Sequence, residues 1–397
     1  MNIIKKFYCR SFQTALRIAL PILPYREPML LSNINELSKV FKKEKIKSIL
    51  IVTDKGIVKS GLVYMLLKVL KDCKVNFTIY DKTKQNPTVD NVEDALVLYK
   101  ENNCGGIISI GGGSSIDCAK VIGARIVCPN KTIRQMKGIL KINRKLPPLI
   151  VIPTTAGTGS EATLAAVITD KNEKYALMSF PLIPHYALLD ASVTYSLPSH
   201  LTATTGMDAL CHAIESYIGR ATTKETRKLA MQATKMIFEN IVIAYNEPNN
   251  YQARNNMLDA SYKAGLAFSK SYVGYIHALA HALGGKYGTP HGLANAIIMP
   301  YVLEEYGSCI YKKLYELAVV SNICDIEDSY QVGAKKFIEA IKGLNIKMNI
   351  INELGIRKED IDLLAIHAEK EANPLYPVPK LMTKDELKGI YLKIGVI

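Results

Sequence analysis

Four of the seven histidines in this 397-residue chain lie within residues 206–292, together with one carboxylate in matching register. Asp208 and His212 are four positions apart, and so are His277 and His281. On an α-helix, side chains at i and i+4 lie on one face, so each pair can direct two donor atoms at one point. The spacing therefore predicts two donor pairs on separate helices.

This donor set predicts a metal site. A carboxylate and several imidazoles that converge from separate helices can hold a divalent metal such as iron(II) or zinc and leave a position for substrate. His291, in the turn Gly-Thr-Pro-His-Gly, adds a further donor. A single His-x-x-x-His pair more often serves packing, so the prediction depends on both pairs and His291 together. Cys211 is disfavoured as a ligand because its direction on a helix differs by about 100° from that of His212.

A second pattern predicts a phosphate-binding turn. The apolar run GGIISI (105–110) leads into GGGSS (111–115), and we expect a helix from Ile116. Glycines after a buried strand let the backbone approach a phosphate, and the helix start offers N–H groups and a positive dipole end. A plain tight turn is the alternative. The place of GGGSS between a strand and a helix, in a chain that also carries a metal pattern, favours pyrophosphate binding.

The elements that position these residues alternate between strands and helices up to about residue 190. We expect a helix over 58–71, another from residue 89, and strands at 47–53, 75–81, 105–110, 148–153, 165–170, 174–180 and 187–190. This order predicts a parallel sheet covered by helices on both faces. From Ser199 the pattern is helical almost throughout.

Two domains are the default for a chain of 397 residues. We predict an α/β, Rossmann-like dinucleotide-binding domain over residues 1–197 and an all-α metal-binding domain over residues 198–397. The active site is expected in the cleft between them. Residues 1–30 mix basic and apolar positions, but Pro21 and Pro24 interrupt the apolar run, so we expect a packed extension and no membrane contact.

Composition narrows the function classes. The formal charge of +14 comes from 50 Lys and Arg against 36 Asp and Glu, but no basic run interleaves with aromatic residues. Nucleic acid is therefore not an expected partner. Eight cysteines without a C-x-x-C motif indicate reduced thiols in a cytoplasmic protein.

Several segments resemble the iron-containing (group III) alcohol dehydrogenase family. GMDALCHAIES and GYIHALAHALGGKYGTPHGLANA are similar to its two signature regions, and GGGSSIDCAK and PTTAGTGSEAT to its cofactor domain. The resemblance implies an Fe(2+) site, with Zn(2+) as the alternative, whose ligands are Asp208, His212, His277 and His291. It places His281 beside the metal as a non-ligand, and we assign it a catalytic role as proton relay.

The same resemblance implies NAD as the cofactor. The corresponding positions for cofactor binding are Asp54, Asn86, Gly112, Gly113, Ser114, Asp117, Thr154, Thr155, Thr158 and Lys174. Asp54 would face the adenosine ribose, and its carboxylate would disfavour the 2′-phosphate of NADP.

The implied activity is that of a metal-dependent alcohol dehydrogenase or aldehyde reductase. Hydride would pass between NAD(H) and a small aliphatic primary alcohol, diol or aldehyde bound to the Fe(II). Phe268, Tyr272 and Tyr275, which precede His277, would line the site or pack the core of the helical domain. We expect a homodimer formed through the N-terminal domain.

Three alternatives remain at this point. One is a glycerol-dehydrogenase-like polyol oxidoreductase that uses zinc, although such enzymes generally carry Lys where this chain has Ser114. The second is a dehydroquinate-synthase-like lyase, which would need a denser set of Lys and Arg near the metal. The third, a non-catalytic nucleotide-binding protein, would predict damaged ligands.

Overall fold

The computed structural model describes residues 3–171, 173–351 and 354–395, and the chain divides into two compact units. One unit comprises Pro24–Leu197, and the other comprises Met1–Leu23 with Pro198–Ile397. The first helix, α1 (Ile3–Ala19), therefore belongs to the helical unit, whereas we had predicted residues 1–197 to form the α/β domain. Residues 1 and 2 of the expected extension lie outside the described residues.

Polar contacts explain where α1 packs. Arg10 donates to the carbonyls of Val378 and Pro379 at 2.7 and 2.9 Å. Gln13, which is buried, donates to the carbonyl of Tyr376 at 2.7 Å. Because these partners lie near the other end of the chain, no local sequence pattern could have indicated them.

The α/β unit contains the predicted parallel sheet, with strand order β1-β9-β6-β4-β2-β3 and parallel pairing throughout. Its strands are β1 (Met29–Leu31), β2 (Ser48–Val52), β3 (Asn76–Tyr80), β4 (Ile107–Gly111), β6 (Leu149–Pro153) and β9 (Tyr186–Leu188). Five of them fall within or next to expected runs. The short β1 was missed.

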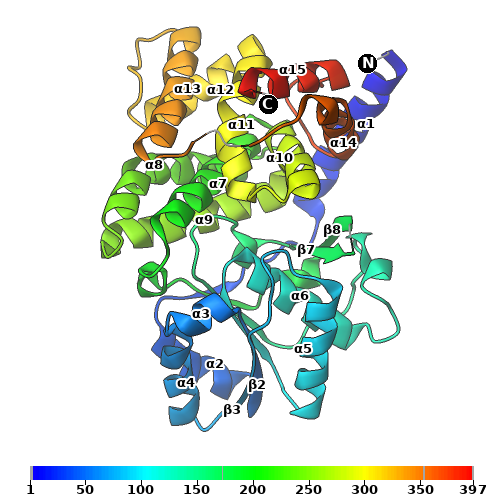
Figure 1. Ribbon diagram of the computed structural model, residues 1–397, viewed down its shortest axis with the longest axis vertical. Coiled ribbons are helices and arrows are strands. Elements are labelled where there is room, and N and C mark those ends of the chain that lie inside the picture. The colour runs from blue at the N-terminus through cyan, green and yellow to red at the C-terminus, as the bar shows by residue number, and fades with distance from the viewer. Residues whose placement is uncertain (1–2, 172, 352–353, 396–397) are drawn as a thin grey trace. The chain divides into compact units, whose positions relative to one another are not determined.

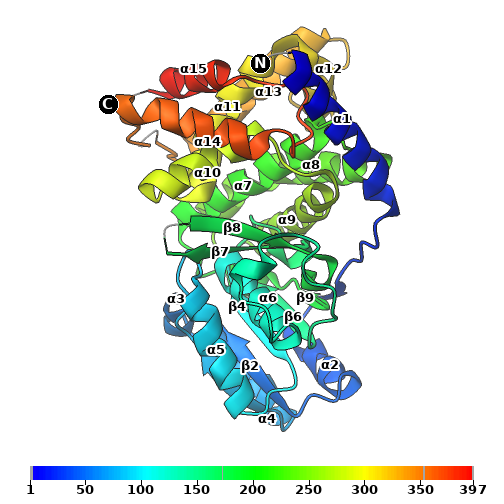
Figure 2. The same ribbon diagram turned by 90° about the vertical axis from the view of Figure 1, so that its right-hand side faces the viewer.

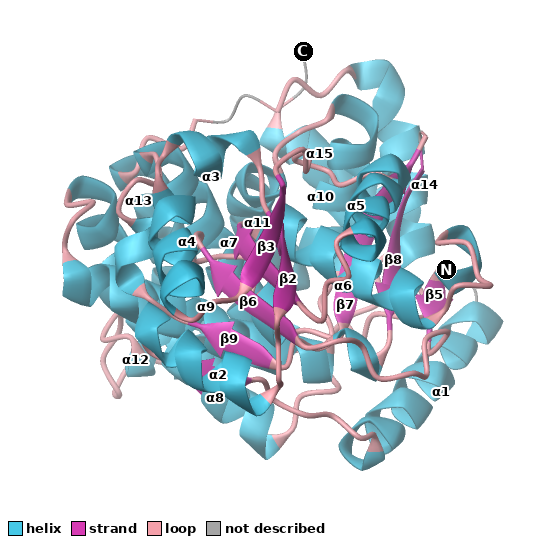
Figure 3. Cartoon of the chain, turned by 90° about the horizontal axis from the view of Figure 1, so that it is seen from below, coloured by secondary structure: helices cyan, strands magenta, loops and turns pink. Residues whose placement is uncertain are grey.

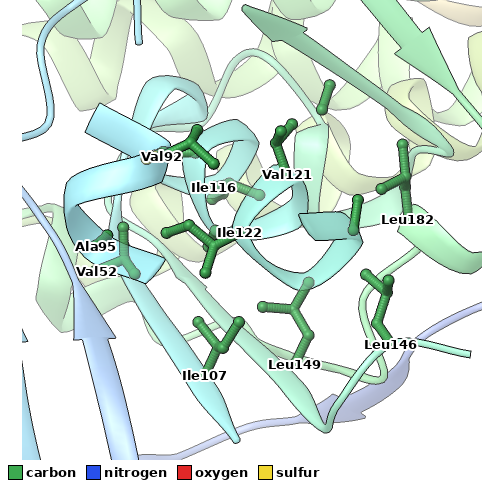
Figure 4. Packing of buried hydrophobic residues seen from close by; sticks show 14 of the residues in the cluster. Val52, Val92, Ala95, Ile107, Ile116, Val121, Ile122, Leu146, Leu149 and Leu182 are labelled. Atoms are coloured by element: carbon green, nitrogen blue, oxygen red, sulfur yellow. The ribbon is translucent and has the colours of Figure 1, made fainter. Parts of the chain in front are cut away.

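Helices cover both faces of this sheet (Figure 3). One face packs on α5 (Val89–Glu101) and α6 (Gly113–Val127), and the other on α2 (Leu37–Lys43) and α4 (Leu62–Asp72). Successive strand residues alternate between the two cores, which explains why the strands read as continuous apolar runs. Figure 4 shows the core beneath α5 and α6, including Val52, Ile107, Ile122 and Leu149.

Two helix boundaries differ from expectation. The helix expected over 58–71 is split into α3 (Lys55–Lys59) and α4, because Gly61 between them has a left-handed φ of 81°. Helix α6 starts at Gly113 rather than Ile116, so the glycine–serine turn already forms its first turn.

A smaller sheet completes the α/β unit. Strands β7 (Ala165–Asp170) and β8 (Glu173–Met178) form an antiparallel pair (Figure 2), and β5 (Gly138–Ile139) adds to β8 in parallel. The expected strands at 165–170 and 174–180 therefore lie outside the main sheet.

The second unit is helical, as predicted (Figure 1). After α1 it contains α7 (Ser199–Ile218), α8 (Lys224–Asn246), α9 (Tyr251–Ser271), α10 (Tyr275–Tyr287), α11 (His291–Tyr306), α12 (Tyr311–Val320), α13 (Tyr330–Lys347), α14 (Ile361–Ala372) and α15 (Lys384–Ile394). Short 3₁₀ helices across the chain are η1 (Leu20–Ile22), η2 (Ile34–Glu36), η3 (Arg134–Met136), η4 (Ser160–Ala162), η5 (Phe180–Leu182), η6 (Ala191–Thr194), η7 (Gly307–Cys309) and η8 (Lys358–Asp360). Within the described residues, no helix has both the length and the apolar character needed to cross a bilayer.

Candidate active site

Three helices of the helical unit bring the predicted metal donors together. Asp208 and His212 lie on α7, one turn apart, and both are buried. His277 lies in the first turns of α10, and His291 is the first residue of α11. One donor atom from each of the four side chains lies within 4.8 Å of the others.

The side-chain amide of Asn295 shows how closely these donors converge. Its Nδ2 donates to Oδ1 of Asp208 at 2.7 Å and lies 3.1 Å from Nε2 of His291 and 3.4 Å from Nε2 of His277. One carboxylate oxygen and two imidazole nitrogens thus surround a single electropositive group. A set of one carboxylate and three imidazoles suits zinc or iron(II), so these residues fit a divalent metal.

His277 is held through its other ring nitrogen. Its Nδ1 lies 2.6 Å from Oε2 of Glu215 and 3.6 Å from Sγ of Cys211. Burial raises the pKa of the Cys211 thiol well above its ordinary value, which disfavours the thiolate that a metal needs. Although Cys211, Glu215 and His277 form a second cluster of metal-binding residue types, we interpret it as the support of His277.

Burial sets the charge states around this contact. It lowers the pKa of His277 well below its ordinary value, and the nearby His212 and His291 act in the same direction. A neutral imidazole keeps a lone pair for a metal. Burial also raises the pKa of Glu215 to about 7, although backbone N–H groups bonded to this carboxylate oppose the shift.

Among the aromatic residues expected near the site, Phe268 contacts a predicted ligand. Its ring stacks on His212 with centroids 4.1 Å apart and an interplanar angle of 13°. Tyr275 is instead fully buried, and its hydroxyl bonds to Asn373 at 2.9 Å and to the N–H of Met382 at 2.9 Å. Tyr275 is therefore a packing residue.

His281 lies beside the donor set with a partner of its own. Its ring stacks on His291 at a centroid distance of 5.0 Å. Its Nδ1 is 2.6 Å from Oε1 of Glu371, and Tyr376 donates its hydroxyl to the same oxygen at 2.7 Å. The side chain of His281 is 35% exposed, which distinguishes it from the buried His277.

In the α/β unit, the glycine turn joins β4 to α6. Gly112 is the N-cap of α6 and provides no side-chain cap, so the helix start suits an anionic ligand. A Cβ at Gly113 would meet Thr158 at 2.8 Å, and one at Gly112 would meet Thr155 at 3.4 Å. Glycine thus lets two segments assigned to the cofactor approach each other.

Asp54 lies beside this turn. Strands β2 and β4 are neighbours in the sheet, although β3 separates them in sequence and pairs on the other side of β2. Ligands of open α/β sheets bind at such a switch point, beyond the carboxyl ends of the strands. Asp54 follows β2, and its Oδ2 lies 3.6 Å from the position of a Cβ at Gly111. Its Oδ1 caps α3 by accepting from the N–H groups of Gly56 and Ile57.

The remaining predicted cofactor residues make contacts within the α/β unit. Lys174 donates to Oδ1 of Asn86 at 3.0 Å, so these two positions are adjacent. Thr154 is buried at the end of β6, where its N–H donates to the carbonyl of Gly111 at 3.0 Å. The hydroxyl of Ser114 donates to the carbonyl of Gln85 at 2.8 Å.

Asp117 is engaged on both carboxylate oxygens. Oδ1 accepts from the hydroxyl of Ser160 at 2.7 Å, and Oδ2 accepts from the N–H of Val167 at 2.9 Å. These bonds tie α6 to the segment that follows Thr158. The geometry therefore indicates that Asp117 holds this segment in position against α6.

Sequence reasoning missed three residues near the donor set. Glu215 is seven positions after Asp208 and Asn295 is four after His291, so helical spacing carried a signal for both. Glu371 had none, because it lies on a helix 90 positions beyond His281.

Comparisons with known proteins agree with this architecture. Residues 31–191 match the family profile "Iron-containing alcohol dehydrogenase", and residues 202–395 match "Fe-containing alcohol dehydrogenase family, C-terminal". The chain is 38% identical to alcohol dehydrogenase 4 of Saccharomyces cerevisiae, over 91% of this chain and 94% of that protein. It is 36% identical to 1,3-propanediol dehydrogenase of Klebsiella pneumoniae, over 87% and 90% of the two chains.

Solved structures give the same result. The crystal structure of a 1,3-propanediol oxidoreductase superposes with a TM-score of 0.89 and 34% identity, covering 93% of this chain and 99% of that one. Both domains and the majority of the chain are included in these matches. The chain belongs to the iron-containing alcohol dehydrogenase family and is an oxidoreductase that acts on CH–OH groups.

Proposed function

We propose that this enzyme transfers hydride between NAD(H) and a small aliphatic primary alcohol, diol or aldehyde, with iron(II) held by Asp208, His212, His277 and His291. The observation that carries the proposal is the convergence of these four donor atoms within 4.8 Å. A metal bound there would act as a Lewis acid on the substrate oxygen, and a nicotinamide would donate or accept the hydride.

The protein's own residues would hold and orient the reactants. Phe268 restricts the ring of His212 by stacking, and Glu215 restrains the ring of His277. His281, bonded through Nδ1 to Glu371, would use Nε2 to take or return the substrate proton. This division of roles separates a proton relay from the four ligands.

Cofactor binding is proposed at the switch point between β2 and β4. The start of α6 at Gly113 would receive the pyrophosphate, and Asp54 would accept hydrogen bonds from the adenosine ribose. Because a carboxylate repels the 2′-phosphate of NADP, we propose NAD as the preferred cofactor.

The substrate class rests on similarity. Two relatives are named for 1,3-propanediol and one for alcohol. These names support a small alcohol or diol and do not favour the lyase or the non-catalytic alternative. Zinc is the alternative metal, as it would be in a glycerol-dehydrogenase-like oxidoreductase.

A turnover assay tests the proposal. Anaerobically purified protein, loaded with Fe(II) or Zn(II), would be assayed with NAD and NADP against ethanol, propanol, butanol, 1,2- and 1,3-propanediol and glycerol, and with NADH against the aldehydes. We expect NAD-linked turnover of at least one small primary alcohol or diol that depends on added metal. Metal-independent turnover, or activity restricted to glycerol with zinc, would contradict it.

A homodimer is also proposed, as expected from the sequence, but the surface offered for it is α1, which belongs to the helical unit and not to the α/β unit. The side of α1 opposite its buried contacts carries Ile3, Ile4 and Phe7, which are 85%, 79% and 74% exposed. An apolar face of this kind is typical of surfaces that another protein covers. We propose that a second copy of the chain covers this face.

The eight free cysteines fit a reducing compartment such as the cytoplasm.

A further inference from the structure

Glu215 is a buried carboxylate on the same face of α7 as Asp208 and His212. The three lie at positions i, i+4 and i+7, and Glu215 is 3% exposed. A buried carboxylate is costly unless hydrogen bonds compensate for the lost hydration. The contacts of Glu215 therefore indicate why it is there.

Both oxygens of Glu215 accept backbone hydrogen bonds from the start of α10. Oε2 accepts from the N–H of Gly274 at 2.7 Å, and Oε1 accepts from the N–H of Ile276 at 2.8 Å. Gly274 is the N-cap of α10 and supplies no cap of its own. A carboxylate from α7 thus caps α10, a position where negative charge is also favoured by the helix dipole.

The same carboxylate contacts His277, three residues after this N-cap. Oε2 of Glu215 is 2.6 Å from Nδ1 of His277. The two backbone N–H groups favour the ionised carboxylate, which can only accept, so we assign the proton in this contact to Nδ1. Nε2 then carries the lone pair, and it lies 3.9 Å from Oδ1 of Asp208.

Gly274 allows this close approach. A Cβ at position 274 would lie 2.7 Å from Oε1 of Glu215, below any ordinary contact. A larger residue would displace the carboxylate from both the helix start and the imidazole. Gly274 therefore leaves the space that the carboxylate of Glu215 occupies beside His277.

We propose that Glu215 is a positioning residue that fixes the tautomer and ring orientation of His277 and thereby sets the affinity of the site for its metal. The inference rests on the proposed function, since it requires the four-residue donor set to bind a divalent metal. Partners of this kind typically contribute a factor of 10 to 100 in metal affinity.

The first test measures metal affinity rather than turnover. Zn(II) affinity would be determined for the whole protein by competition with a chromophoric chelator. We expect Glu215→Gln to weaken Zn(II) binding by roughly 10- to 100-fold. The matched control is Glu316→Gln, which removes another carboxylate bonded to α7, through the hydroxyl of Tyr217 at 2.5 Å, and should leave the affinity unchanged. Affinity of Glu215→Gln within twofold of wild type would overturn the proposal.

A second variant and a second readout cover the case in which Glu215→Gln fails to fold. Gly274→Ala retains Glu215 but pushes its carboxylate away from the start of α10 and from His277, and we expect it to weaken Zn(II) binding in the same direction. In the metal-free wild-type protein, ¹⁵N NMR of His277 should show Nδ1 protonated and Nε2 unprotonated. The opposite tautomer would overturn the proposal. Wild-type protein without measurable Zn(II) affinity would instead refute the metal site itself.

Discussion

Oε1 of Glu371 lies 2.6 Å from Nδ1 of His281, so the imidazole that stacks on His291 is oriented by a carboxylate of its own. The contact leaves Nε2 of His281 for a proton when Nδ1 carries the other. A residue held in this way suits a relay rather than a ligand.

His281→Ala should therefore keep the metal and lose rate. We expect kcat to fall by roughly 10²- to 10⁴-fold, the usual contribution of a positioned acid or base, with a loss that depends on pH. Metal content by elemental analysis and kcat across pH 6 to 10 check this. Added imidazole should restore part of the rate. Loss of the metal would make His281 a ligand and remove one of the other four.

Asp54 is expected to select NAD. The repulsion between its carboxylate and a 2′-phosphate should favour NAD by roughly ten- to a thousandfold in kcat/KM. Because Oδ1 of Asp54 also caps α3, Asp54→Asn is a sharper variant than Asp54→Gly: it removes the charge and keeps a good N-cap. We expect Asp54→Asn to raise kcat/KM for NADP with little change for NAD. An unchanged ratio of kcat/KM for NAD to that for NADP would show that the Asp54 carboxylate does not discriminate between the two cofactors.

The stability of the α/β unit should depend on pH through Glu161. Burial raises the pKa of this carboxyl from its ordinary 4.5 to about 7. Between these values the folded protein holds a proton that the unfolded chain has released, so the free energy of unfolding falls as pH rises, by roughly 3 kcal/mol in total.

Glu161→Gln should remove this part of the slope. The urea midpoint of the variant, measured between pH 4.5 and 7, should fall less with rising pH than that of wild type. Glu101→Gln, at an exposed position, is the control and should keep the wild-type slope. Parallel curves for Glu161→Gln and wild type would exclude the buried carboxyl as the cause.

Self-association should depend on the exposed face of α1. Phe7→Ser and Ile4→Ser remove apolar surface without touching the contacts of Arg10 and Gln13. We expect the double variant to sediment with a larger monomer fraction than wild type at micromolar concentration. Ile326→Ser, at a residue 74% exposed elsewhere on the helical unit, is the control. A wild-type protein that is monomeric at these concentrations would refute the proposed dimer.

Local periodicity predicted much of the fold. The inner strands β2, β4, β6 and β9 are buried on both faces and therefore read as apolar runs. The Asp208–His212 and His277–His281 spacings place each pair on one face of a helix. These features depend only on neighbours in sequence.

Tertiary contacts were beyond the reach of the sequence. Glu215 contacts His277 across 62 positions, and the partners of α1 lie more than 360 positions away. The spacing of residues along one helix does not identify the element that packs against that helix. The break at Gly61 was also missed, because a helical pattern of apolar residues continues across it while the backbone does not.

The most direct test of the account is the metal content of His291→Ala. Anaerobically purified wild-type protein should contain about one divalent metal per chain, because one set of four donors suits a single ion. His291→Ala should lose both the metal and turnover while NAD still binds, measured by elemental analysis and by NADH fluorescence. A His291→Ala protein that retains its metal and its rate would contradict the assigned site.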